Sequence, residues 1–480
     1  MVIPLVFIAI RLVFAPLTEL CGDEAYYWVW SRSLSWGYLD HPPMVAWLIR
    51  ASTGVLGSNE LAVRLPGILL AGGTIMLATY AGHLLGLARK SLLLLQVVLL
   101  CFPMLQVAGA IFTPDTPALF FALLTLVAAL LCLNRPENWA SWWLLGLAAG
   151  LAMLSKYTAL LPVAAILTFL LIHSPRRWYK PVLAGVIAIV VISPMLYWNY
   201  ERDWLSFAFQ LSHGTSPDGR AWYVNFGDFI AAQAIVANPL LMPLLVYCGV
   251  RILIRPATAG HRLLAVAGLV TLFGFAATSL LHKVEANWPT LTWIPLIVLL
   301  VTVLPSASAR LSRYTRIAII VAGISTFVLM LPPSLLARLN KHSPLNQVDG
   351  WGPLAQGIRS KTTTLPIICT RYQDASLFAF YISGQPDIRV LRMPNDRISH
   401  YDQLPLPELG QGFTLVTDHA LRPGPLTLVQ QDNRFEVEVL SVDHLALDIG
   451  GRQMRGCFFG VCTTAQRDAT TQRGYIERLP

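Results

Sequence analysis

The sequence contains little charge. Only 13% of its 480 residues are charged and 55% are hydrophobic, and the mean hydropathy is +0.57. This composition excludes an ordinary soluble globular protein and predicts a membrane protein. The first residues lack a small-residue cleavage site and continue into further apolar segments. We therefore interpret Val2 to Leu17 as a retained helix rather than a removed signal peptide.

The sequence also lacks a basic stripe with interleaved aromatic residues, so its net charge of +9 does not indicate nucleic-acid binding. About 32 charged residues precede Pro333 and about 29 follow it, although the second part is less than half as long. We therefore expect two domains. Residues 1–332 would form a transmembrane body whose first outer loop covers residues 18–60, and residues 333–480 a soluble extracytoplasmic domain.

Long apolar runs predict an α-helical polytopic membrane protein with about eleven transmembrane helices. After the first, the candidate spans are 65–82, 92–112, 118–133, 142–154, 160–172, 182–197, 229–247, 263–281, 291–304 and 317–331.

The distribution of charge predicts the orientation. With the N-terminus in the cytoplasm, about twelve of the body's roughly twenty basic residues fall in five short inner loops. Of its roughly twelve acidic residues, only Glu137 falls inside, and we interpret the outer acidic cluster as an active site. The same alternation of basic inner loops and outer loops favours a hairpin between Trp142 and Ile172, with Lys156 at its outer tip.

The C-terminal region mixes strand-like runs at 365–369 and 413–416 with a helix-like stretch at Asp374–Tyr381, which predicts a small α+β domain. Cys457 and Cys462 lie close together in this region. An oxidising compartment would permit a disulfide between them. The alternative is two small buried side chains.

Asp23 and Glu24 directly follow the first apolar segment. A transferase that moves a sugar to a hydroxyl needs a carboxylate to accept the hydroxyl proton. Two neighbouring acids, with His41 nearby in sequence, could also hold a divalent metal ion such as Mg²⁺, Mn²⁺ or Zn²⁺. The alternative is an acid pair that caps a short interfacial helix. Asp40 and His41, held before Pro42-Pro43, could bind metal or phosphate or form an interfacial turn.

Three further polar residues fall on the predicted outer face. Asp115 starts a helix, where it could serve as a cap or as part of the site. Lys156 and Lys283 lie in tight loops between apolar segments, where each could extend to the interface or bind an anion. The loop of Lys283 continues to Asn287 and is rich in polar groups.

The order of these motifs resembles that of bacterial GT-C membrane glycosyltransferases, relatives of dolichyl-phosphate-mannose protein mannosyltransferases and of the aminoarabinose transferase that modifies lipid A. The motifs are 23–28 (DEAYYW), 38–43 (YLDHPP), 113–117 (TPDTP), 154–158 (LSKYT) and 287–289 (NWP).

The resemblance implies a polyprenyl-phosphate sugar donor, inverting transfer and an active site on the outer face of a bacterial inner membrane. It implies that Asp23 is the general base or a metal-facing acid supported by Glu24, and that Asp40 and His41 face the donor phosphate. Aminoarabinose enzymes have a glutamate and a lysine before Pro-Pro, where this sequence has Asp40 and His41. The identity of the sugar therefore stays open, and the acceptor could be lipid A, another glycan or a protein hydroxyl. The alternatives are a lipid-linked sugar transporter or flippase, and a non-catalytic scaffold; the sequence has no internal repeat of the kind many transporters show.

Overall fold

The computed structural model describes residues 2–215, 219–329, 350–361, 365–394, 396–406, 412–418, 420–430, 433–449 and 452–468. The chain divides into two compact units. The first contains Met1–Ala15 and Leu34–Leu331, and the second contains Pro16–Ser33 and Pro332–Pro480. The segment Pro16–Ser33, which sequence reasoning assigned to the membrane body, therefore groups with the C-terminal region.

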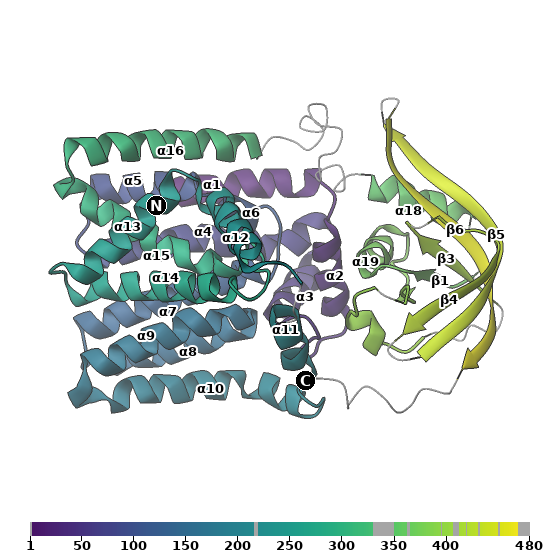
Figure 1. The fold of residues 1–480 in the computed structure, drawn as a ribbon, viewed down its shortest axis with the longest axis horizontal. Helices are drawn as coiled ribbons and strands as arrows, with labels where there is room; N and C mark the ends of the chain where they lie inside the picture. Colours follow the sequence, from purple (N-terminus) through teal and green to yellow (C-terminus); the bar gives the residue numbers. More distant parts are fainter. Residues whose placement is uncertain are drawn as a thin grey trace. The chain divides into compact units, whose positions relative to one another are not determined.

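The first unit is helical throughout its described residues (Figure 1). Its α-helices are α1 (Val2–Phe14), α3 (Met44–Leu56), α4 (Glu60–Leu84), α5 (Arg89–Leu100), α6 (Pro103–Ala108), α7 (Asp115–Asn134), α8 (Trp139–Ser155), α9 (Leu160–His173), α10 (Tyr179–Tyr200), α11 (Leu205–Thr215), α12 (Trp222–Ala237), α13 (Leu241–Ile254), α14 (Ala259–Thr278), α15 (Trp293–Val303) and α16 (Ala309–Leu329). Short 3₁₀ segments connect them, among them η2 (Tyr157–Ala159), η3 (Pro175–Arg177) and η4 (Trp288–Thr292).

Six helices among the described residues are long and apolar enough to cross a membrane, or up to eight if each of two bent pairs counts as one span. The protein is thus a multi-helix membrane protein as predicted, but the count of eleven is not confirmed. Two predicted spans are broken for local reasons. Pro103 starts a new helix inside 92–112, and the run 229–247 bends by 95° where Asn238 adopts φ +73° before Pro239.

The hairpin predicted between Trp142 and Ile172 is present. An ion pair of 2.8 Å joins Arg177 Nε, just after α9, to Glu137 Oε1, just before α8. One straight helix over α8 and α9 would separate these ends by roughly 50 Å. The chain therefore reverses at η2, next to Lys156.

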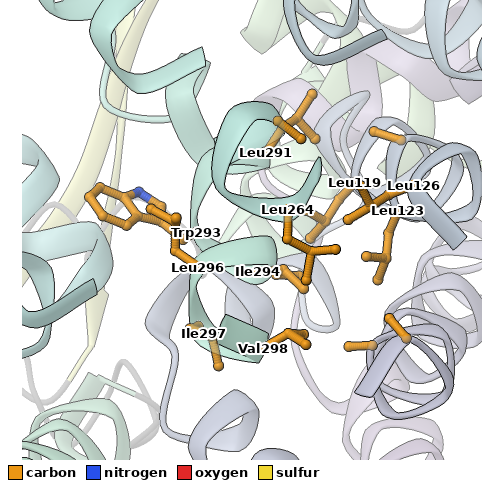
Figure 2. Packing of buried hydrophobic residues seen from close by; sticks show 14 of the residues in the cluster. Leu119, Leu123, Leu126, Leu264, Leu291, Trp293, Ile294, Leu296, Ile297 and Val298 are labelled. Carbon is orange, nitrogen blue, oxygen red and sulfur yellow. The ribbon is translucent and has the colours of Figure 1, made fainter. Parts of the chain in front are cut away.

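Helix α15 forms the centre of the first unit. Ten of its eleven residues are buried, which is expected for a helix that is apolar on every side. Figure 2 shows Ile294 and Val298 of α15 among leucines of α7 and α14. This core fixes the start of α7 and the η4 segment, which both carry predicted site residues.

The second unit contains a six-stranded mixed sheet in the order β2-β1-β3-β6-β5-β4. Strand β1 runs parallel to β2 and β3, and the remaining pairs are antiparallel. Three helices accompany the sheet: α2 (Gly22–Arg32), α18 (Trp351–Lys361) and α19 (Tyr372–Tyr381). The strands are β1 (Ile367–Cys369), β2 (Arg389–Val390), β3 (Phe413–Thr417), β4 (Gly424–Gln430), β5 (Asn433–Ile449) and β6 (Arg452–Asp468).

Both strand-like runs and the helix-like stretch predicted in this region are therefore present, as β1, β3 and α19. All residues of β1 and β3 are buried, as expected for strands covered on both faces.

The predicted disulfide between Cys457 and Cys462 is wrong. Both residues lie on β6, which pairs with β5 from Arg452 to Asp468, and the register shift opposite Val461 and Cys462 has its extra residue in β5, between Val439 and Ser441. Five residues of strand span roughly 16 Å, whereas a disulfide needs Cα atoms within about 7 Å. Cys462 is instead fully buried in the core of the second unit, as in the alternative of a small packing residue.

Candidate active site

The acid pair at the start of α2 divides into two different roles. Glu24 is fully buried, and its carboxylate accepts a hydrogen bond of 3.1 Å from the backbone N–H of Cys21. Asp23 is exposed to solvent. Successive residues on a helix point about 100° apart. Glu24 therefore stabilises the first turn of α2, while Asp23 is the carboxylate that a substrate can reach.

The surroundings of Asp23 favour a proton acceptor. Although its side chain reaches solvent, the protein around it desolvates the carboxylate and raises its pKa, and the neighbouring negative charge of Glu24 adds to this. The positive charge of Arg397 acts in the opposite direction. A carboxylate with a raised pKa that stays accessible is suited to general-base catalysis.

Helix α2 is held in the second unit by hydrogen bonds just before its start and along its length. The Glu19 carboxylate accepts the N–H groups of the first two residues of α18, at 2.6 and 2.9 Å. The N–H of Leu20 donates to the Tyr381 hydroxyl at 2.7 Å, and the N–H of His400 donates to the Tyr26 hydroxyl at 2.6 Å. These bonds fix the position from which Asp23 projects.

Close backbone packing also joins α2 to α19. A Cβ atom added at Gly22 would lie 2.7 Å from Gln373 Cβ, so only glycine allows this approach. Nearly two turns later, the rings of Trp28 and Phe380 meet edge to face with centroids 5.0 Å apart. The aromatic residues that follow the acid pair are therefore packing residues, and Tyr372 and Gln373 of α19 pack against the same helix.

Arg397 is the residue that sequence reasoning missed. It lies far from Asp23 in the sequence, and no motif marks it. Its guanidinium lies 5.9 Å from the centroid of the Tyr372 ring, and this ring lies 4.5 Å from that of Tyr26. Arg397 is thereby placed beside the first turns of α2.

A second polar cluster lies in the first unit and joins three of the predicted residues. Lys156 Nζ lies 2.6 Å from Asp115 Oδ1, and Asn287 Nδ2 donates to Asp115 Oδ2 at 2.8 Å. The cluster connects the start of α7, the end of α8 and the start of η4. The side chains of Lys156 and Asp115 are only 6% and 15% exposed. Lys156 is therefore neither extended to the interface nor an isolated anion site, because a buried carboxylate neutralises it.

Lys283 does not join this cluster in the structure. Its Nζ pairs with Glu285 Oε1 at 2.9 Å, and the two side chains are 57% and 42% exposed. An exposed pair of this kind contributes only about 0–1 kcal/mol. Lys283 can therefore exchange Glu285 for another anion at little cost.

The loop before α3 forms a closed turn around Tyr38. The N–H of Tyr38 donates to the carbonyl of His41 at 3.2 Å, and the Tyr38 hydroxyl accepts the N–H of Ser35 at 3.1 Å. Burial raises the pKa of Tyr38 to about 12. Asp40 is 4% exposed, and its carbonyl accepts the side-chain amide of Gln210. The predicted phosphate-binding role of Asp40 and His41 stays a prediction.

The metal site predicted from the sequence would use Asp23, Glu24 and His41. Among the residues that the structure describes, no three His, Cys, Asp or Glu side chains converge on one point. The Glu24 carboxylate accepts a hydrogen bond from the backbone N–H of Cys21. The metal role of these residues stays a prediction.

Comparison with known proteins agrees with the motifs. Residues 40–198 match the family model described as dolichyl-phosphate-mannose-protein mannosyltransferase. The chain is 26% identical over 330 residues to lipid A galacturonosyltransferase RgtD of Rhizobium johnstonii, covering 65% of this chain and 66% of that protein. It is 29% identical over 267 residues to lipopolysaccharide core galacturonosyltransferase RgtA of the same organism, covering 53% and 52%. The matched region thus spans about half to two thirds of these relatives.

The fold is that of a solved membrane protein. The structure superposes on ArnT from Cupriavidus metallidurans bound to undecaprenyl phosphate with a TM-score of 0.65. The match covers 95% of this chain and 97% of that one, at 15% sequence identity. The resemblance to GT-C membrane glycosyltransferases that the sequence motifs indicated is confirmed.

Proposed function

We propose that this protein is an integral-membrane glycosyltransferase that moves a sugar from a polyprenyl-phosphate donor to an acceptor hydroxyl, with Asp23 as the general base. The observation that carries the proposal is the accessible, desolvated carboxylate of Asp23 at the start of a helix whose N-terminal approach is fixed by hydrogen bonds. The names of the relatives, which are glycosyltransferases, support the same reaction class.

The chemistry is a single displacement. Asp23 accepts the proton of the acceptor hydroxyl while its oxygen forms a bond to the anomeric carbon of the sugar. The bond from that carbon to the phosphate oxygen breaks on the opposite side, and polyprenyl phosphate leaves with the bonding electron pair. The anomeric configuration is inverted. Phosphate is a good leaving group, so no general acid is needed.

Undecaprenyl phosphate is the ligand named for the ArnT structure, and we infer a polyprenyl-phosphate donor for this chain. The leaving phosphate carries negative charge that a cation must meet. Lys283 suits this role better than Lys156, because its pair with Glu285 is exposed whereas Lys156 is held by Asp115 and Asn287. The Lys156 cluster then acts as a rigid support that joins α7, α8 and η4.

For the acceptor we infer lipid A or the lipopolysaccharide core, because RgtD and RgtA carry these acceptors in their names. We infer that the reaction takes place at the outer face of a bacterial inner membrane, as the charge distribution predicts. Polyprenyl-phosphate-linked galacturonic acid is the first donor to test, and the aminoarabinose donor named for a Pseudomonas paraeruginosa relative is the second.

The test is a transfer assay with purified protein in detergent micelles, radiolabelled polyprenyl-phosphate sugar and lipid A. Label should move to lipid A with inversion of the anomeric centre. Lys283→Ala should raise KM for the donor several-fold, and Lys90→Ala, at another exposed lysine of the first unit, is the control. Movement of labelled donor across proteoliposomes without any transfer would overturn the proposal in favour of a flippase.

A further inference from the structure

The second unit presents a cation beside the proposed base. Arg397 and Asp23 are both exposed, and they interact electrostatically. The Tyr372 ring contacts both Arg397 and Tyr26, with its centroid 5.9 Å from the guanidinium and 4.5 Å from the centroid of the Tyr26 ring. Tyr26 follows Asp23 by three residues, and residues at this spacing share a helix face. Arg397 is therefore held on the face of α2 that carries Asp23.

We propose that Arg397 and Tyr372 form a binding site for an anionic group of the acceptor, a phosphate or a carboxylate near the reacting hydroxyl. This inference rests on the proposed function and deepens it, because it names the chemistry of the acceptor. It also makes the C-terminal unit a contributor to substrate binding rather than an appendage.

The geometry of inverting transfer assigns Arg397 to the acceptor and not to the donor. The attacking oxygen and the leaving phosphate lie on opposite sides of the anomeric carbon. The base Asp23 is on the side of the attacking oxygen, because it removes that oxygen's proton. A cation fixed beside Asp23 therefore meets the acceptor, while the donor phosphate leaves on the other side.

Two neighbouring basic groups are less suited to this role. Arg371, at the start of α19, pairs with Asp418 at 2.6 Å. Burial lowers the pKa of His400 to about 4, so this side chain is neutral at physiological pH. A guanidinium has five N–H donors in a planar fork that matches phosphate or carboxylate oxygens. It can hold an acceptor anion while its charge still acts on Asp23.

The test compares two forms of the protein, each assayed with two acceptors. Wild type and Arg397→Gln are assayed with phosphorylated lipid A and with the same lipid after enzymatic removal of its phosphates. For the phosphorylated acceptor, the substitution should raise KM about tenfold, since one charged hydrogen bond is worth about that much. Any change in kcat caused by the loss of the positive charge beside Asp23 should be the same for both acceptors. For the dephosphorylated acceptor the substitution should change KM less than twofold. Arg397→Lys should fall between, and Arg422→Gln, which removes an exposed arginine of the same unit, should match wild type.

Several results would overturn the inference. An equal KM increase for both acceptors would mean that Arg397 does not recognise phosphate. Unchanged kinetics with both would remove it from the site. A third acceptor that bears a carboxylate in place of the phosphates distinguishes the two anions. If Arg397→Gln raises KM only for this acceptor, the site binds a carboxylate. Direct binding of phosphorylated lipid A without donor, measured by native mass spectrometry, does not depend on transfer. Weaker binding to Arg397→Gln would support the site even if no transfer occurred, so the two proposals fail separately.

Discussion

The buried pair of Lys156 and Asp115 should dominate the stability of the first unit at this end of its helices. Their charged atoms are 2.6 Å apart and their side chains are 6% and 15% exposed. Removal of one partner leaves the other charge buried, which typically costs about 3–5 kcal/mol. We expect Lys156→Met to lower the free energy of unfolding by about that amount. Asn287→Ala removes one hydrogen bond to the same carboxylate and should cost about 1.5–3 kcal/mol.

The assay is denaturant-induced unfolding in detergent micelles, followed by tryptophan fluorescence. Lys283→Met is the matched control, because its pair with Glu285 is exposed and should contribute about 0–1 kcal/mol. The double variant Asp115→Asn/Lys156→Met should lose clearly less stability than the sum of the single variants, because neither charge remains without its partner. Equal losses for Lys156→Met and Lys283→Met, or strict additivity in the double variant, would refute the reasoning.

Three further predictions concern the second unit. Gly22→Ala should destabilise it by about 1–3 kcal/mol, because the new methyl group would lie 2.7 Å from Gln373 Cβ; Gly54→Ala, which meets nothing within 4 Å, is the control, and equal unfolding midpoints would contradict the packing. Glu19→Gln weakens two hydrogen bonds at the start of α18 and should cost about 1–2 kcal/mol, seen as faster proteolysis of the C-terminal region; an unchanged cleavage rate would exclude this anchor. Burial raises the pKa of the Cys462 thiol to about 11, so N-ethylmaleimide should label it slowly at pH 8 until the protein unfolds, and rapid native labelling would contradict its burial.

The sequence was sufficient to predict that Asp115, Lys156 and Asn287 share a face. Helices that cross a membrane alternate in direction, so the parity of the spans places loops on one side or the other. Parity does not give distances, and it could not show that Lys156 contacts Asp115 while Lys283 pairs within its own loop. That choice depends on how the core around α15 positions α7 and η4.

Other features were hidden from sequence reasoning for different reasons. The alternation of Phe435, Val437 and Val439 with polar residues marks β5 as a strand and could have revealed the long β5–β6 hairpin. The docking of α2 in the second unit had no such signal, because it depends on contacts between residues more than three hundred positions apart. Arg397 was missed for the same reason. Only the fold brings it to the helix of Asp23.

The most direct test of the account is sugar transfer by purified Asp23→Asn. The substitution keeps the size of the side chain and removes its ability to accept a proton. The account predicts a folded protein with an unchanged unfolding midpoint and a loss of transfer of about 10²-fold or more, as expected when a general base is removed. Glu24→Gln should retain more activity, because Glu24 stabilises α2 and does not face the acceptor. Full transfer activity in Asp23→Asn would contradict the account.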